Sequence, residues 1–264
     1  MTGHLQNARF AWALLGTNLK ASLMLRKAFA AQMLFMALNN LTFFAFWWLL
    51  MRRVPTIRGW VLGDVQVLFG IVAVAFGLAV TVAGGVRHLG RLIDEGELDT
   101  LLVQPKSVLV HAWGLRSQAS GFGDAVSGLA LIAWSGQVSW NDAPRIAMAI
   151  GASAVVFVAT GTLFFSLPFW MGRVDALSRQ LWELLVTFAL YPEPLFGGAL
   201  RLVLFTLLPA AWVGYVPVRV VHEDGWAPLV LLALAATGYM TLAVFAFSQG
   251  LNRYSSGSRF ATHG

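Results

Sequence analysis

Two long runs of uncharged, largely apolar residues set the first limit on how this chain can fold. The first run extends from Ala28 to Met51 and the second from Val65 to Val86. Each is long enough for the roughly 20 residues that an α-helix needs to cross the hydrocarbon core of a bilayer. Charged residues make up only 11% of the chain, against about 25% in a soluble domain. The sequence therefore predicts an all-α, polytopic membrane protein.

Four more segments have the composition of membrane spans. They cover about Ser117–Val138, Ile146–Met171, a short segment from Gln180, and Ala227–Gln249. The short segment meets two prolines within Tyr191-Pro192-Glu193-Pro194 after about three turns, and prolines break a helix. The apolar residues 195–213 that follow are either a further span or a re-entrant segment that returns to the side it left.

The distribution of Lys and Arg favours the re-entrant alternative, because cytoplasmic segments are richer in these residues. Six spans, with both termini in the cytoplasm and a re-entrant element at residues 191–213, put twelve of them inside and five outside. The inner ones are Arg9, Lys20, Arg26, Lys27, Arg87, Arg91, Lys106, Arg116, Arg173, Arg179, Arg253 and Arg259; the outer ones are Arg52, Arg53, Arg58, Arg145 and Arg219.

Residues 1–27 precede the first span and residues 28–264 form a single transmembrane domain. Apolar residues recur at roughly helical spacing in the first 27 residues, with basic residues among them. Such a segment is expected to lie as an amphipathic helix in the membrane interface. A plain cytoplasmic lead into the first span is the alternative.

Residues 87–107, between the second and third spans, hold four of the protein's 12 carboxylates. Leucines at helical spacing lie on both sides of Gly96, which favours a bend, and Pro105 ends the second half. The pattern predicts two short amphipathic helices that form an acidic elbow on the cytoplasmic side. A solvated loop that only joins two spans is the alternative.

Glycines recur along the second span, at residues 70, 77, 84 and 85. Small residues allow a second helix to approach closely within a membrane. We therefore expect a neighbouring helix to pack along this side of the span.

Polar side chains interrupt three of the spans. Asn39 and Asn40 lie in the first, where amides either bond to a neighbouring helix or line a substrate path. Asp124 lies in the third and Glu183 in the fifth. A carboxylate within a span is costly and marks a function or a paired contact, although Asp124 at the level of the lipid headgroups is an alternative.

Several kinds of chemistry have no signature in this sequence. It contains no G-x-x-x-x-G-K-[ST] nucleotide-binding loop, no H-E-x-x-H and no cysteine, and its five histidines are dispersed. The basic residues form no patch with interleaved aromatics, which argues against nucleic acid as a partner. We expect a chain that is not itself an enzyme and that carries no cofactor or metal.

Three stretches are similar to the ABC-2 type transporter permeases, the membrane subunits of bacterial ATP-binding-cassette exporters. They are 94–102 followed by Pro105, then Tyr191-Pro192 with Arg201 and Leu208-Pro209, and finally residues 247–257. The resemblance covers the chain from about residue 90 to its end. The N-terminal third adds only a compatible pattern of interfacial helix and two spans.

The resemblance implies that the elbow is a coupling helix, which docks in a groove of a separate ATPase subunit that binds ATP and Mg²⁺. Glu95, Gly96, Glu97 and Asp99 would meet that subunit, while Leu98, Leu101 and Leu102 would hold the elbow to the membrane domain. The full set of expected coupling residues is Asp94, Glu95, Gly96, Glu97, Leu98, Asp99, Leu101, Leu102 and Pro105.

The resemblance also implies two permease chains, the same or paralogous, in the bacterial plasma membrane, with a pathway between them. Candidate residues for the pathway or the interface are Asn39, Asn40, Asp124, Glu183, Tyr191, Pro192, Glu193 and Arg201. The residues leave open a transporter or channel that works without an ATPase, and a membrane-embedded enzyme without a recognisable motif. The cargo is also left open.

Overall fold

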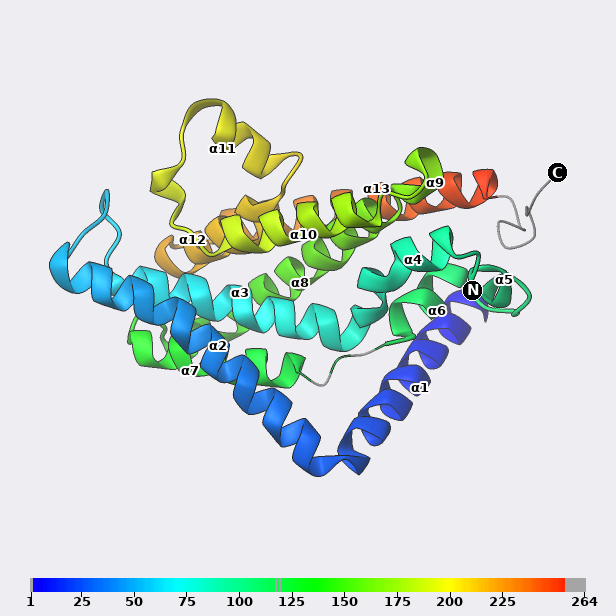
Figure 1. Ribbon diagram of the computed structural model, residues 1–264. Helices are drawn as coiled ribbons and strands as arrows, with labels where there is room; N and C mark the ends of the chain where they lie inside the picture. The colour runs from blue at the N-terminus through cyan, green and yellow to red at the C-terminus, as the bar shows by residue number, and fades with distance from the viewer. Residues whose placement is uncertain (1, 117, 119, 255–264) are drawn as a thin grey trace.

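The computed structural model describes residues 2–116, 118 and 120–254, and within these the chain is helical with short connections (Figure 1). The described residues contain no β-strand, only an isolated bridge between Ile57 and Trp60. The predicted all-α class is confirmed. Ser117, where the third span was expected to begin, and residues 255–257 of the C-terminal motif lie outside the described residues, as does Arg259.

The longer helices are α1 (Thr2–Met24), α2 (Arg26–Arg53), α3 (Leu62–Ala83), α7 (Gly121–Ser135), α8 (Ala143–Phe165), α10 (Asp175–Ala189) and α13 (Ala227–Arg253). The shorter ones are η1 (Gly84–His88), α4 (Leu89–Asp94), α5 (Asp99–Leu102), α6 (Val108–Gly114), η2 (Trp140–Asp142), α9 (Pro168–Met171), η3 (Glu193–Leu195), α11 (Gly198–Phe205), the π-helix η4 (Ala211–Tyr215) and α12 (Val216–His222).

Helix α3 is the centre of a bundle that also contains α2, α7, α8, α10 and α13 (Figure 1). In its most apolar stretch 78% of the residues are buried, against 11% in α2 and 22% in α13. Helix α1 turns away from α2 at Leu25 and lies against α6. We name the two ends of the bundle the elbow end, with residues 84–107 and 166–174, and the loop end, with residues 54–61, 136–142, 190–197 and 223–226.

Glycines bring α3 and α7 into backbone contact. A Cβ atom placed on Gly70 would lie 2.7 Å from the carbonyl oxygen of Gly128, and one on Gly77 would collide with the carbonyl oxygen of Gly121. Any larger side chain would force the helices apart, because packed interiors have little spare volume. The expected close approach along the second span therefore occurs, and α7 is the partner.

Four helical segments of the described chain are long and apolar enough to cross a membrane: Arg26–Arg53, Leu62–Asp94, Trp140–Met171 and Ala227–Arg253. Helices α7 and α10 contain 15 residues each, or about 22 Å at 1.5 Å per residue. Gly136, in a left-handed conformation, ends α7 early. The described residues therefore contain fewer helices of full spanning length than the six spans expected from the sequence.

The chain between α10 and α13 leaves the loop end and returns to it (Figure 1). Helix α11 lies on the outside, while η4 and α12 pack into the bundle against α8. The carbonyl groups at the C-terminal end of α11 accept hydrogen bonds from side chains. Tyr239 donates to the carbonyl oxygens of Phe205 (3.0 Å) and Thr206 (2.7 Å), and Trp212 donates to that of Phe205 (2.8 Å). Irregular backbone of this kind is tolerated within a membrane only when it is buried in protein.

Candidate functional site

The elbow is built around a glycine turn between α4 and α5. Gly96 has a φ of +72°, which glycine adopts at little cost. The amide of Glu97 donates to the carbonyl oxygen of Leu92 (2.9 Å), and that of Gly96 to the carbonyl oxygen of Ile93 (3.3 Å). These two bonds form a Schellman motif that ends α4. The elbow is thus two short helices at a fixed angle, as the pattern around Gly96 predicts.

The leucines of the elbow divide into buried and exposed ones. Leu98 and Leu101 belong to the hydrophobic core of the bundle, which fits the expectation that they hold the elbow in place. Leu102 is 43% exposed and the neighbouring Val103 is 84% exposed. The expectation that Leu102 packs inward is therefore wrong for this chain, because α5 is a single turn that directs only one side to the core. Glu95 and Pro105 are exposed beside them.

The end of α13 reaches the elbow through Tyr254. Burial and the neighbouring carboxylate of Asp99 raise the pKa of Tyr254 to about 12. The ring of Tyr254 also lies against Phe169 of α9, with ring centroids 6.2 Å apart. Asp99 is only partly exposed, so it joins the elbow to the last helix as well as facing outward.

Helix α1 contacts the chain immediately after the elbow. The rings of Phe10 and His111 meet edge to face at 5.1 Å, and the ammonium group of Lys106 lies 5.7 Å from the centroid of Phe10. The side chain of Asn18 donates to the carbonyl oxygen of Gly114 over 2.7 Å. The elbow is therefore connected to the first helix and to the last one.

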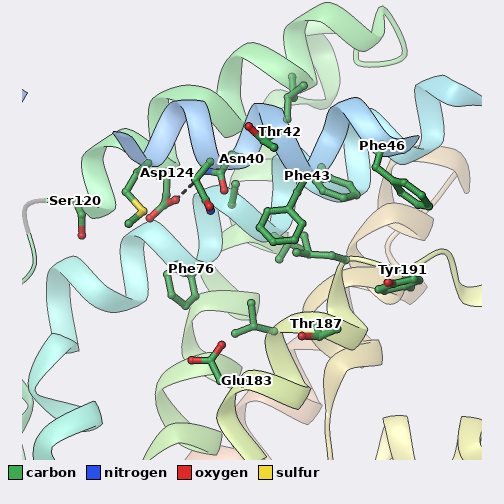
Figure 2. A pocket seen from close by; sticks show the side chains of 18 of the residues that line it. Asn40, Thr42, Phe43, Phe46, Phe76, Ser120, Asp124, Glu183, Thr187 and Tyr191 are labelled. Carbon is green, nitrogen blue, oxygen red and sulfur yellow. Dashed lines mark hydrogen bonds between the residues drawn. The ribbon is translucent and has the colours of Figure 1, made fainter. Parts of the chain in front are cut away.

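A cavity of about 590 Å³ opens between α2, α3, α7 and α10 (Figure 2); we name it the α2–α10 cavity. Five of the pathway candidates line it, namely Asn39, Asn40, Asp124, Glu183 and Tyr191. The first four come from three helices that are far apart in the sequence, and Tyr191 follows the end of α10. Its remaining lining is mainly apolar and aromatic.

Asp124 lies deep in this cavity. Its side chain is 4% exposed, and its Oδ1 accepts a hydrogen bond from Nδ2 of Asn40 at 2.8 Å (Figure 2). Asn40 also donates to Oγ of Ser127 at 2.9 Å. The structure therefore shows Asp124 buried in the protein and paired with Asn40.

Glu183 lies on the opposite wall, on α10, with an exposed side chain. Arg87 of η1 also lines the cavity. Neither residue forms a salt bridge within the described chain. The cavity thus combines two carboxylates and one guanidinium group with an apolar surface.

Pro192, Glu193 and Arg201 do not line this cavity. The carboxylate of Glu193 lies at the loop end, 2.8 Å from the guanidinium group of Arg201 and 2.6 Å from that of Arg219. The three charges join η3, α11 and α12. Glu193 and Arg201 thus form, together with Arg219, a charged clamp on the segment between α10 and α13, which we name the Glu193 clamp.

The aromatic residues of the cavity were not among the residues expected from the sequence. Phe43 and Phe46 of α2 and Phe76 of α3 line it (Figure 2). A signal was present, because Met36, Asn40, Phe43 and Trp47 recur at intervals of three and four residues and so share one face of a helix. The hydrophobicity of the whole span hides that face.

The chain matches a known protein family. The sequence pattern of the ABC-2 family transporter proteins matches residues 37–258. No curated protein and no solved structure matches the chain. The matched region includes the elbow, α3, α7, α10, the greater part of α2 and the segment between α10 and α13. The chain therefore belongs to the ABC-2 transporter family, whose members are membrane components of transporters.

Proposed function

We propose that this chain is the permease subunit of an ATP-driven exporter in the bacterial plasma membrane. Two permease chains, the same or paralogous, work with a separate ATPase that binds ATP and Mg²⁺. The observation that carries this proposal is the elbow: Leu98 and Leu101 anchor it in the core, while Glu95, Leu102 and Val103 are exposed at its tip. A rigid, anchored and partly apolar tip is suited to docking in another protein.

Helix α10 offers a route from the elbow to the cavity. Asp175 in its first turn lies against Gly90 of α4, so that a Cβ atom on Gly90 would be 2.8 Å from Oδ1 of Asp175. Asp175, Arg179 and Glu183 follow at intervals of four residues on one face, and the first two form a salt bridge of 2.6 Å. A displacement of the elbow is passed by this helix to the wall of the cavity. ATP drives transport if it favours one arrangement over the other through different contacts.

The proposed topology has six spans with both termini in the cytoplasm and residues 191–213 re-entrant from outside. The return of the chain to the loop end before α13 supports this arrangement (Figure 1). The 15-residue helices α7 and α10 are shorter than a typical bilayer core. A local thinning of the bilayer accommodates such helices at a modest cost.

Docking of the ATPase is tested by placing a charge on the elbow tip. We expect Val103→Glu to reduce the ATPase activity that co-purifies with the tagged chain from membranes, because a carboxylate in an apolar contact is left unpaired. Val54→Glu is the matched control, since Val54 is 45% exposed at the other end of the bundle. Co-purification that is equal for both variants, or transport by the chain without any ATPase, would overturn the proposal.

A further inference from the structure

The α2–α10 cavity contains a carboxylate that the described chain does not neutralise. Oδ1 of Asp124 accepts from Asn40, but Oδ2 is buried without a hydrogen-bond partner. No Lys, Arg or His of the described residues forms a salt bridge with Asp124. A buried carboxylate is costly unless a proton or a cation accompanies it. Within the described residues, no cationic side chain forms an ion pair with the carboxylate of Asp124.

Glu183 adds a second carboxylate on the facing wall (Figure 2). It lies near the middle of α10, where an exposed charge would be unfavourable against lipid. Arg87 is a positive side chain in the lining, but it is in η1 at the elbow end. The helix α3 that carries Gly77, next to Asp124, ends at Ala83, before Arg87. With two carboxylates against one guanidinium group, the charged lining of the cavity is acidic on balance.

Aromatic rings line the cavity that holds the two carboxylates. Phe43, Phe46, Phe76 and Tyr191 belong to this lining, and in Figure 2 Phe76 lies nearer to the carboxylates than Phe46 and Tyr191 do. The face of an aromatic ring attracts a cation, and apolar rings also cover the hydrophobic part of a ligand. Carboxylates and rings together select a positive charge on an apolar body.

We propose that the cargo of this permease is an organic cation with an aromatic or aliphatic body. The inference rests on the proposed function, because it names the class of molecule that the same cavity carries. The charged group of the cargo lies between Asp124 and Glu183, and its apolar part lies against Phe43 and Phe76. An anion is repelled by both carboxylates, and a neutral molecule leaves Asp124 without a counter-charge.

Two ions of similar size and opposite charge test this selection directly. Tetraphenylphosphonium and tetraphenylborate are added to the purified chain with its ATPase in lipid nanodiscs, and binding to empty nanodiscs is subtracted. We expect saturable binding of the phosphonium and none of the borate. Equal binding of the two ions, or preference for the borate, overturns the inference.

Isosteric variants then locate the site. Asp124→Asn and Glu183→Gln each remove one negative charge without changing the size of the side chain, and Asn at 124 still accepts the hydrogen bond from Asn40. We expect each to weaken phosphonium binding roughly tenfold. Asp224→Asn is the control, because Asp224 is exposed at the loop end outside the cavity. An equal loss in the control, or no loss in either cavity variant, overturns the inference.

The two proposals fail in different ways. If the chain binds the phosphonium through Asp124 but no ATPase docks on the elbow, the proposed function is wrong and the cation site stands. If the ATPase docks and the complex hydrolyses ATP without discriminating between the two ions, the cation site is wrong and the proposed function stands.

Discussion

The side-chain amide of Asn40 donates to the carboxylate of Asp124 over 2.8 Å and so joins α2 to α7. The two residues are 84 positions apart in the sequence, and each lies in a largely apolar helix. Since α2 has only three buried residues, Phe44, Trp47 and Met51, this bond is an important part of its attachment to the bundle.

Replacing Asn40 is expected to destabilise the protein. Asn40→Leu leaves Oδ1 of Asp124 without its donor, and a buried polar group without a partner costs about 1–3 kcal/mol. Asn39→Leu is the matched control, because Asn39 is exposed to the cavity. Thermal unfolding in nanodiscs measures both. A midpoint that falls equally in the two variants would show that the bond contributes nothing specific.

Two glycine-to-alanine substitutions should have opposite effects on stability. Gly77→Ala places a methyl group against the backbone of Gly121, and such overpacking costs about 1–3 kcal/mol. Gly238→Ala in α13 meets no atom within 4 Å, and alanine stabilises a helix by about 0.5–1 kcal/mol relative to glycine. Thermal unfolding midpoints measure both effects, a decrease for Gly77→Ala and an increase for Gly238→Ala. A Gly77→Ala variant as stable as the original chain would exclude the close α3–α7 contact.

The orientation of the chain is accessible because the sequence contains no cysteine. Single cysteines are introduced as Val103→Cys at the elbow and Trp140→Cys at the loop end, where the original side chains are 84% and 93% exposed. We expect an impermeant maleimide to label position 140 in spheroplasts and position 103 only in inside-out vesicles. The reverse labelling pattern would place the elbow outside the cell and remove the basis for docking.

The Glu193 clamp should control the mobility of α11. Glu193→Gln removes the charge that holds Arg201 and Arg219. Since both guanidinium groups are partly exposed, we expect a loss of only about 1–2 kcal/mol. Amide hydrogen exchange in residues 198–205 should become roughly tenfold faster. Glu223→Gln, which changes an exposed carboxylate at the same end, serves as the control and should leave that exchange unchanged.

The His222–Asp64 pair predicts a dependence of stability on pH. A hydrogen bond to Asp64, 3.1 Å away, raises the pKa of His222. Because the folded-state pKa lies above the unfolded value of about 6.5, this stabilisation is complete below about pH 6.5 and is lost as the pH rises through the folded-state pKa. His222→Gln should flatten the corresponding fall in the unfolding midpoint. An unchanged slope in the variant would assign the pH dependence to other groups.

The elbow and the α3–α7 contact could be predicted from the sequence because local chemistry determines both. A glycine between two amphipathic half-stripes predicts a turn, and Gly96 forms it. Glycines at a spacing of seven residues predict a close helix contact, and Gly70 and Gly77 make it. In both cases the property of a single residue type is sufficient.

Other features depend on contacts between distant segments. Burial of Asp124 depends on Asn40, and exposure of Leu102 depends on the single-turn length of α5. Neither is visible in the periodicity of one segment. Helix α7 also ends at Ser135, before Gly136, whereas the hydropathy of the sequence predicts a span that continues to Val138. The π-helix at residues 211–215 contains Gly214, which packs on the backbone of Ala189. No local sequence pattern predicts this π-helix.

The contact between Tyr254 and Asp99 has a practical consequence for anyone who handles this protein. Whatever is fused after the last helix emerges next to the surface on which a partner is expected to sit. A fluorescent reporter or a bulky purification handle at that position is therefore a poor choice for assembly assays. The connection between α7 and α8, where Trp140 is almost fully exposed, is at the other end of the bundle and is the better place for an epitope.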